Sequence, residues 1–257
     1  MNPALIVPDW PAPPGVRAAS TLRIGGVSPP PWHSLNLAEH VGDDPARVAE
    51  NRRLLARALD PPEAPAWLEQ VHGRDVLRLD EARLPAPRVA DGAVTARPGR
   101  VLAVLTADCL PVLLCRADGR RVGIAHAGWR GLAAGVLEAT FAALEAPADE
   151  VLAWIGPGIG ADAYEVGADV RDACLAASAD ADECFAPGRP GRWQLDLAGL
   201  ARRRLEAIGL TRLSGGQWCT YADPERFYSH RRDGTDRPTG RMATLIWLER
   251  RLERRPL

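Results

Sequence analysis

The sequence of 257 residues contains no lysine, so all 32 of its basic residues are arginines. Any cationic side chain that binds an anion here must therefore be a guanidinium. The formal net charge of −1 at pH 7 excludes a strong overall field that would attract nucleic acid or a membrane surface. No apolar run approaches the roughly 20 residues that a membrane span needs. We therefore expect no nucleic acid and no membrane among the partners.

A secretory signal and a disulfide framework are also lacking. The first residues, MNPALIVPDWPAPPGV, have no positively charged segment, and prolines interrupt their short apolar stretch. The five cysteines are an odd number and form no dense pattern. Such usage favours free thiols in a reducing compartment. These features predict a cytoplasmic protein.

Strands and helices are expected without strict alternation along the chain. A helix is predicted over 43–60, where Asp43 or Asp44 can cap it and Pro45 suits its first turn. The nearly continuous apolar run 100–107 predicts a strand buried on both faces. Further helices are expected at 132–144 and 195–210, and further strands at 66–71, 75–79, 150–156, 217–221 and 243–249.

This mixture of elements predicts the α/β class, as a single-domain sandwich built on mixed sheets. The absence of internal repeats and of long linkers favours one domain over residues 1–257. Its proline-rich N-terminal segment, 1–19, is expected to be irregular.

The stretch 105–131, LTADCLPVLLCRADGRRVGIAHAGWRG, contains two apolar runs around an Asp-Gly turn at 118–119. Asp-Gly is typical of a two-residue hairpin turn, and a four-residue loop would give the same register. Either loop places Pro111 opposite His126. Cys109 is two residues from Pro111 and therefore shares the face of His126. The alternative is an ordinary core cysteine beside a hydrogen-bonded histidine.

A third ligand would turn this pair into a metal site. His72 stands in a similar setting, because it ends a strand-like run and precedes a glycine. The other histidines are expected to be solvated or to make single hydrogen bonds: His33, His40 and His230. Two imidazoles and one thiolate with an open fourth position would form a catalytic zinc site, since structural zinc sites usually have four protein ligands.

Eight stretches of the chain, in order, resemble the YfiH-like or laccase-domain family, also described as multicopper polyphenol oxidases and as purine nucleoside phosphorylases. They span roughly residues 20–248, and ADCLP followed by HAGWRG is their most specific part. The stretches are TLRIGGVS, SLNLAEHVGDDPARVAENRR, LEQVHGRDV, ADGAVT, TADCLPVLL, AHAGWRG, IGPGIGADAYEVG and CTYADPERFYSHRRDGTDRPTGRMATLIWL.

The resemblance implies a single-domain α/β sandwich and a catalytic zinc site made by His72, Cys109 and His126. It also implies phosphorolysis of adenosine, inosine and methylthioadenosine, with adenosine deaminase activity. The expected partners are therefore a small nucleoside and phosphate, and the expected state is a monomer. Copper is the alternative metal.

Phosphorolysis requires an anion-binding group, for which arginine forks are suited. Arginines at positions that match the family are Arg23, Arg52, Arg130 and Arg232. Three polar residues in otherwise apolar stretches could read ribose or base, or equally bond loop backbone: Ser34, Asn36 and Gln70. For proton transfer in deamination the candidates are Asp108, which strand alternation points to the opposite face from Cys109, and Asp91, which could equally cap a turn.

The residue types alone allow three other functions. A copper oxidase would use the same His and Cys ligands, but a multicopper enzyme also needs a histidine-rich cluster that the remaining histidines do not supply. A cysteine hydrolase would use Cys109 as nucleophile and His126 as base. A zinc-stabilised protein that binds or edits cell-wall precursors is the third, since an editing role has been attached to the family.

Overall fold

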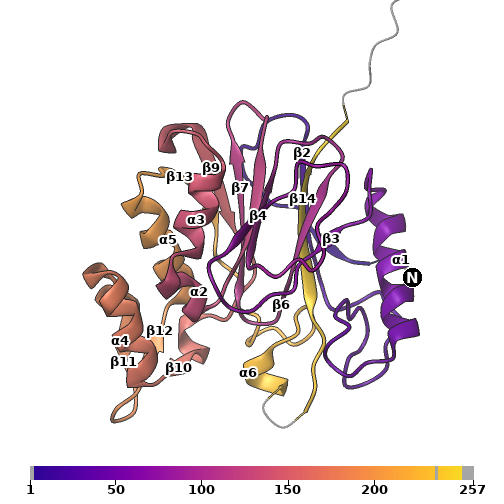
Figure 1. Cartoon of the computed structure of the whole chain (residues 1–257). Coiled ribbons are helices and arrows are strands. Elements are labelled where there is room, and N and C mark those ends of the chain that lie inside the picture. The colour runs from indigo at the N-terminus through magenta and orange to yellow at the C-terminus, as the bar shows by residue number, and fades with distance from the viewer. Residues whose placement is uncertain (1–2, 235–236, 251–257) are drawn as a thin grey trace, which may run out of the picture.

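Two β-sheets pack face to face at the centre of the molecule, and helices cover both outer faces (Figure 1). The computed structural model describes residues 3–234 and 237–250. In the described chain the five-stranded sheet has the order β1 (Leu5–Ile6), β2 (Val16–Thr21), β14 (Met242–Leu248), β6 (Val101–Thr106), β3 (Ala66–Trp67). The six-stranded sheet has the order β13 (Arg212–Gly215), β9 (Val151–Ile155), β7 (Leu110–Arg116), β8 (Val122–Ala127), β5 (Gly92–Thr95), β4 (Val76–Arg78).

Both large sheets are mixed. Strand β6 pairs antiparallel with β14 and parallel with β3, while β9 pairs antiparallel with β7 and parallel with β13. A small antiparallel sheet lies outside the sandwich, in the order β10 (Glu165–Val166), β12 (Trp193–Leu195), β11 (Phe185–Pro187). The mixed-sheet α/β class that the sequence predicts is therefore confirmed.

Helices lie on the two outer faces. Helix α1 (Pro45–Leu59) packs against the five-stranded sheet, and the other side carries α2 (Trp129–Ala134), α3 (Val136–Ala143), α4 (Ala168–Ala177) and α5 (Leu197–Ala207) (Figure 1). Short α6 (His230–Asp233) lies at the edge of the sandwich near the start of β14. The 3-10 helices are η1 (Ala148–Glu150), η2 (Ala161–Ala163) and η3 (Ala179–Cys184). In the described part of the chain, no helix combines the length and apolarity that crossing a bilayer requires.

The layers explain the unbroken apolar runs. Every residue of β6, β8, β9 and β14 is buried, because one face of each strand meets the other sheet and the second face meets helices or loops. Leu113 and Trp154 of the six-stranded sheet pack in the same cluster as Leu102 and Ile246 of the five-stranded sheet. This cluster joins the two sheets and holds the strand ends in fixed positions.

Local capping signals place two of the helices as expected. Asp44 caps α1 by accepting a hydrogen bond from the backbone N–H of Ala46, and Pro45 is its first residue. Asp196 caps α5 in the same way, through the N–H of Gly199. The helix expected at 132–144 begins earlier and is interrupted, because Gly135 adopts a left-handed conformation with φ of 92° between α2 and α3.

Two expectations about strands were wrong. The segment 1–19 is not wholly irregular, since β1 and most of β2 lie in it and pair at the edge of the five-stranded sheet. Prolines interrupt regular structure between these strands but do not prevent the flanking residues from pairing. The stretch 217–221 is not a strand, because it contributes only an isolated bridge between Cys219 and Gly158. The extended pairing beside β9 is made instead by β13.

Candidate metal centre

The β7–β8 hairpin has the register that the sequence predicts, with Pro111 opposite His126. The connection is the four-residue loop, in which the N–H of Arg116 donates to the carbonyl of Arg121 at 3.0 Å. This register brings Cys109 and His126 together at the open end of the hairpin. A two-residue loop would have given the same register.

Cys109 lies where the chain passes from one sheet to the other. Strand β6 ends at Thr106 and β7 begins at Leu110, so three residues make the crossing. Asp108 at its centre has a φ of 87°, which is rare for a residue other than glycine. Its carboxylate accepts hydrogen bonds of 2.6 Å from the hydroxyl of Thr220 and of 2.6 Å from the N–H of Arg231. Asp108 therefore holds the crossing against the segment that leads into α6.

Three side chains from separate segments converge at this crossing. The ligand atoms of His72, Cys109 and His126 all lie within 4.8 Å of one another. The Sγ of Cys109 is 3.9 Å from Nε2 of His72, and the two imidazole rings meet edge to face with centroids 4.8 Å apart. His126 is buried, Cys109 is half-buried and His72 is exposed. Two imidazoles and one thiolate with one side open fit a zinc ion that keeps a position for substrate.

The carboxylate of Asp91 connects the segment of His72 with His126 through hydrogen bonds. One carboxylate oxygen, Oδ1, is 2.7 Å from Nδ1 of His126 and 3.0 Å from the N–H of His72. The other, Oδ2, accepts hydrogen bonds from the N–H groups of Val71 at 3.1 Å and Gly73 at 2.7 Å. The bond to Nδ1 fixes the ring of His126 so that Nε2 is left for a metal. The sequence allows Asp91 a role as proton carrier, but in the structure it positions ligands.

The charges around the cluster favour an ionised cysteine. Burial raises the pKa of Cys109, but the charge and hydrogen bond of His126, followed by those of His72, outweigh burial and bring the pKa down to about 6. Burial lowers the pKa of His126, while Cys109 and Asp91 outweigh it and raise that pKa to about 9. Thiolate is the form in which cysteine binds metals. By contrast, burial alone raises the pKa of Cys115 to about 12, in keeping with a core thiol.

The cluster opens on a cavity of about 480 Å³. The residues that line it are His40, Leu68, Glu69, Gln70, His72, Leu105, Thr106, Ala107, Cys109, His126, His230 and Arg241. Sequence reasoning missed His40, His230 and Arg241 as members of this site. No spacing signal links them to Cys109, because His40 and Arg241 lie in loops and His230 begins α6, and these segments meet only in the folded chain.

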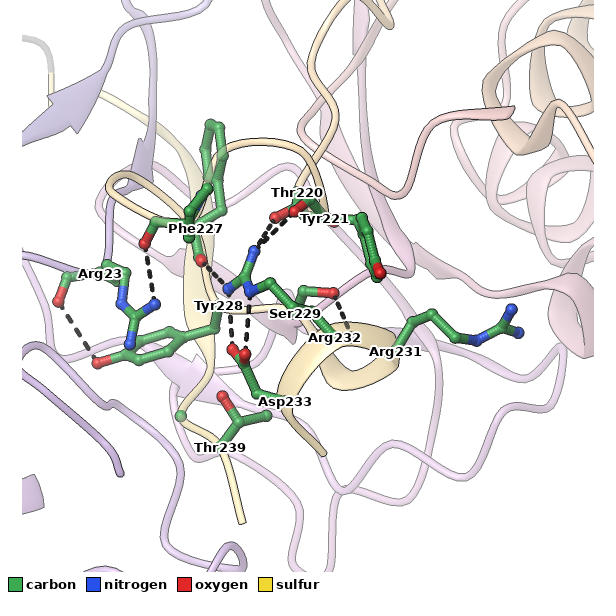
Figure 2. Close-up of polar contacts among 12 residues, drawn as sticks. Arg23, Thr220, Tyr221, Phe227, Tyr228, Ser229, Arg231, Arg232, Asp233 and Thr239 are labelled. Atoms are coloured by element: carbon green, nitrogen blue, oxygen red, sulfur yellow. Dashed lines mark hydrogen bonds and ion pairs between the residues drawn. The ribbon is translucent and has the colours of Figure 1, made fainter. Parts of the chain in front are cut away.

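Arg232 lies outside this cavity and is held by its own chain. Figure 2 shows its guanidinium turned toward backbone carbonyls, while Arg231 points the other way. Asp233 forms an ion pair with it at 2.8 Å. The carbonyls that accept its hydrogen bonds, at 2.8 to 3.0 Å, are those of Thr220, Tyr221 and Phe227.

Arg23 is also enclosed. It donates to the carbonyl of His33 at 3.1 Å and to that of Pro224 at 2.9 Å, and it stacks on the ring of Tyr228 at 4.7 Å (Figure 2 shows the stacked pair). Arg23 and Arg232 both line a second hollow, which contains no member of the metal-ligand cluster among its described residues.

The other two arginine candidates lie elsewhere. Arg52 donates twice to the carbonyl of Leu37 and stacks on Trp67 at 4.5 Å. Arg130 is exposed and stacks on the neighbouring ring of Trp129 at 4.3 Å. The structure therefore brings none of these candidates into the lining of the cavity, and substrate binding by them stays a prediction.

The three polar candidates bond loop backbone. The hydroxyl of Ser34 accepts from the N–H of Gly26 at 3.1 Å. Fully buried Asn36 accepts from the N–H of Arg241 at 3.1 Å. Gln70 bonds both the carbonyl and the N–H of Leu105, at 2.8 and 2.7 Å, and also lines the cavity. These contacts agree with the second of the two roles that the sequence allows, and substrate reading by these residues stays a prediction.

A mixed α/β sandwich that gathers two imidazoles and a thiolate at the crossing between its sheets defines a class of candidate metal-binding proteins. The chain belongs to the family described as multi-copper polyphenol oxidoreductase laccase, whose family model matches residues 17–249. The resemblance drawn from the sequence is confirmed.

Curated relatives and solved structures agree with this assignment. The chain is 52% identical over 247 residues to a purine nucleoside phosphorylase of Pseudomonas aeruginosa, covering 96% of this chain and 99% of the relative. It is 51% identical over 244 residues to the purine nucleoside phosphorylase YfiH of Escherichia coli, covering 95% and 98%. A solved structure from Neisseria meningitidis superposes with a TM-score of 0.90 at 44% identity, covering 96% of this chain and 99% of that one.

Gly128 offers a test of the cluster that leaves the backbone unstrained. Its φ of −77° and ψ of 169° suit alanine, but an added Cβ would lie 2.8 Å from Sγ of Cys109 and 3.3 Å from Cδ2 of His72. We expect Gly128→Ala to displace these ligands and weaken zinc binding by about tenfold or more. A competition titration with a chelator measures the affinity.

Gly73→Ala is the matched control, because its Cβ would have its nearest contacts at 3.6 Å although it adjoins His72. This variant should bind zinc like the wild type. Equal zinc affinity in Gly128→Ala and Gly73→Ala would show that the cluster does not hold the metal.

Proposed function

We propose that this protein is a zinc-dependent enzyme that cleaves adenosine, inosine and methylthioadenosine with phosphate and also deaminates adenosine. The observation that carries the proposal is the convergence of His72, Cys109 and His126 on a cavity of about 480 Å³. A cavity of this size suits a small molecule such as a nucleoside. The purine nucleoside phosphorylases among the relatives support the substrate class.

The three converging side chains are proposed to hold the zinc ion. Cys109 supplies a thiolate, and His126 presents Nε2 because Asp91 occupies Nδ1. When bound, zinc would supply Lewis-acid polarisation of a substrate group or of water. Copper can use the same ligand set, so metal analysis of the purified protein decides between the two.

The two reactions make different demands on the chain. In phosphorolysis the C1′–N9 bond breaks, a phosphate oxygen bonds to C1′, and the leaving purine takes a proton. In deamination water adds at C6 of adenine and ammonia leaves. The cavity must therefore bind one purine nucleoside in both cases but an additional anion only in phosphorolysis. The proposed partners are accordingly a nucleoside and phosphate. We also propose that the protein acts as a monomer in the cytoplasm.

A multicopper oxidase receives less support from the structure. Within residues 3–234 and 237–250, His72, Cys109 and His126 form the one group of three metal-ligating side chains. The two further histidines of the cavity, His40 and His230, are not part of a second such group. An oxygen-reducing copper cluster would need such a second group of metal-ligating side chains.

The deciding experiment incubates the pure protein with adenosine, with and without phosphate, and separates the products by chromatography. We expect adenine, hypoxanthine and ribose 1-phosphate only when phosphate is present. Inosine should form in either case, and phosphate should convert part of it to hypoxanthine. Chelation should remove both activities and zinc should restore them, because both use the same cluster.

The same assay separates the rival functions. A cysteine hydrolase would keep its activity after chelation, since Cys109 and His126 need no metal to form a nucleophile and a base. A zinc-stabilised binding protein would lose thermal stability on chelation but would convert no nucleoside at any stage. Absence of adenine, inosine and hypoxanthine with the zinc-loaded protein would refute the proposed function.

A further inference from the structure

One arginine that no sequence motif singled out lies in the wall of the cavity. Arg241 directly precedes β14, whose first residue, Met242, pairs with Thr106 at the end of β6. Its backbone is held by two hydrogen bonds, from its N–H to Oδ1 of Asn36 at 3.1 Å and from the N–H of Leu37 to its carbonyl at 3.3 Å. Arg241 is thus fixed beside the crossing that carries Cys109.

Only part of its guanidinium is used by the protein. Nη1 donates to the carbonyls of Thr239 and Gly240 at 2.9 and 3.0 Å. Among the described residues, Nε and Nη2 make no hydrogen bond, and no carboxylate forms an ion pair with the side chain. Burial lowers the pKa of Arg241, and the charges of Cys109 and Asp108 offset this only in part. A partly buried cation without a carboxylate partner is costly unless an anion accompanies it.

Three of the four arginines expected from the sequence differ on this point. Arg23, Arg52 and Arg232 line other hollows, and each spends Nε and both terminal nitrogens on its own chain, on a carbonyl, a carboxylate or an imidazole. Arg241 keeps the pair Nε and Nη2, which is one edge of the fork that binds two oxygens of a phosphate at once.

The remaining polar wall of the cavity is compatible with an anion. Besides the metal-ligand group, the imidazoles of His40 and His230 line the cavity together with Arg241. Among the described lining residues, Glu69 supplies the one carboxylate. Burial, followed by the charges of Arg241 and Arg52, lowers the pKa of His40, so at neutral pH its ring is neutral and can donate one hydrogen bond.

We propose that Arg241 is the residue that binds the phosphate co-substrate, through Nε and Nη2, on the cavity wall beside the metal cluster. The proposal rests on the proposed phosphorolysis. Arg241 holds the phosphate while one of its oxygens forms the bond to C1′, the C1′–N9 electron pair leaves with the purine, and the purine takes up a proton. The four arginines expected from the sequence have no part in this contact.

The test compares Arg241→Gln and Arg241→Lys with the wild type. We expect Arg241→Gln to raise the KM for phosphate at least about tenfold, because two charge-assisted hydrogen bonds are lost. The KM for adenosine should stay within about twofold, and deamination without phosphate should be retained. Arg241→Lys keeps the charge but not the guanidinium fork. Its KM for phosphate should therefore lie between that of the wild type and that of Arg241→Gln. Arg57→Gln, at an exposed position near the end of α1, is the control and should change neither KM.

Direct binding of inorganic phosphate, measured by calorimetry on the zinc-loaded protein, gives a readout that does not depend on turnover. It should weaken in Arg241→Gln by the same factor as the KM for phosphate rises. A purely structural arginine would instead lower thermal stability and raise both KM values together. If Arg241→Gln does not fold, Arg241→Lys decides by the same two measurements.

The outcomes separate the two proposals. A wild-type protein that makes no ribose 1-phosphate from adenosine and phosphate refutes phosphorolysis itself, whether or not it deaminates adenosine. A wild type that makes ribose 1-phosphate, with Arg241→Gln showing an unchanged KM for phosphate, refutes only the role of Arg241. A parallel rise of both KM values also refutes that role.

Discussion

Replacement of Cys109 by alanine should empty the metal centre and lower kcat/KM for adenosine phosphorolysis by about 1,000-fold or more. Cys109 supplies the one thiolate of the cluster, and its removal leaves two imidazoles that make a much weaker zinc site. Metal content should fall from about one ion per chain to less than about a tenth. Atomic absorption on protein dialysed against zinc-free buffer measures this directly, and the product assay measures the rate.

Cys219→Ala is the matched control. Cys219 is also half-buried, and its Sγ accepts hydrogen bonds from the N–H groups of Gly160 at 3.2 Å and Ala222 at 3.4 Å, outside the cluster. This variant should keep its zinc and its activity. A Cys109→Ala protein that retains stoichiometric zinc and turns over adenosine normally would refute the proposed metal centre.

The second large effect is expected for Asp91→Asn. An amide keeps one oxygen, so it can serve either the pair of donors at Oδ1 or the pair at Oδ2, and its NH₂ group must face the other pair. Loss of the contact to His126 should weaken zinc binding by about 10- to 100-fold. Because Asp91 is fully buried, the free energy of unfolding should fall by about 2–4 kcal/mol. Chelator competition and urea unfolding measure the two effects.

The pH dependence of this loss has a definite sign. Burial raises the pKa of Asp91, but the hydrogen bonds from His126 and from backbone N–H groups outweigh burial and bring it below its ordinary value. A carboxyl with a lowered pKa in the folded state stabilises the protein above its unfolded pKa, and this contribution is lost as the pH falls through the folded pKa. The difference in unfolding free energy between wild type and Asp91→Asn should therefore shrink as the pH is lowered from about 7 to about 3.

Asp75→Asn, in the same loop region, provides the control for stability. Asp75 is exposed and contributes its backbone carbonyl rather than its side chain to the hydrogen bonds of Asp91 and Gly92. Its replacement should change the unfolding free energy by less than about 0.5 kcal/mol. A loss in Asp91→Asn that grows toward acid pH would contradict the assigned role of its carboxylate.

Some parts of this protein follow from the sequence by local rules. The caps at Asp44 and Asp196 act on N–H groups two or three residues away, so each helix start is readable from a short window. The hairpin register is readable for the same reason, because the turn and the two-residue period of a strand determine which side chains share a face. Hence the meeting of Cys109 and His126 follows from local spacing.

Other parts were decided only when distant segments packed together. The pairing of β2 with β1 and β14 overrode the irregular appearance of 1–19, since packing against neighbouring strands outweighs local sequence preference in a sheet. The bridging role of Asp91 and the place of Arg241 in the cavity wall depend on segments that meet where the two sheets join. Sequence by itself determined the helix starts, the buried strands and the cysteine–histidine register. Tertiary packing alone selected which carboxylate orients the histidine and which guanidinium in the cavity wall keeps an edge free, because both depend on contacts that no local spacing encodes.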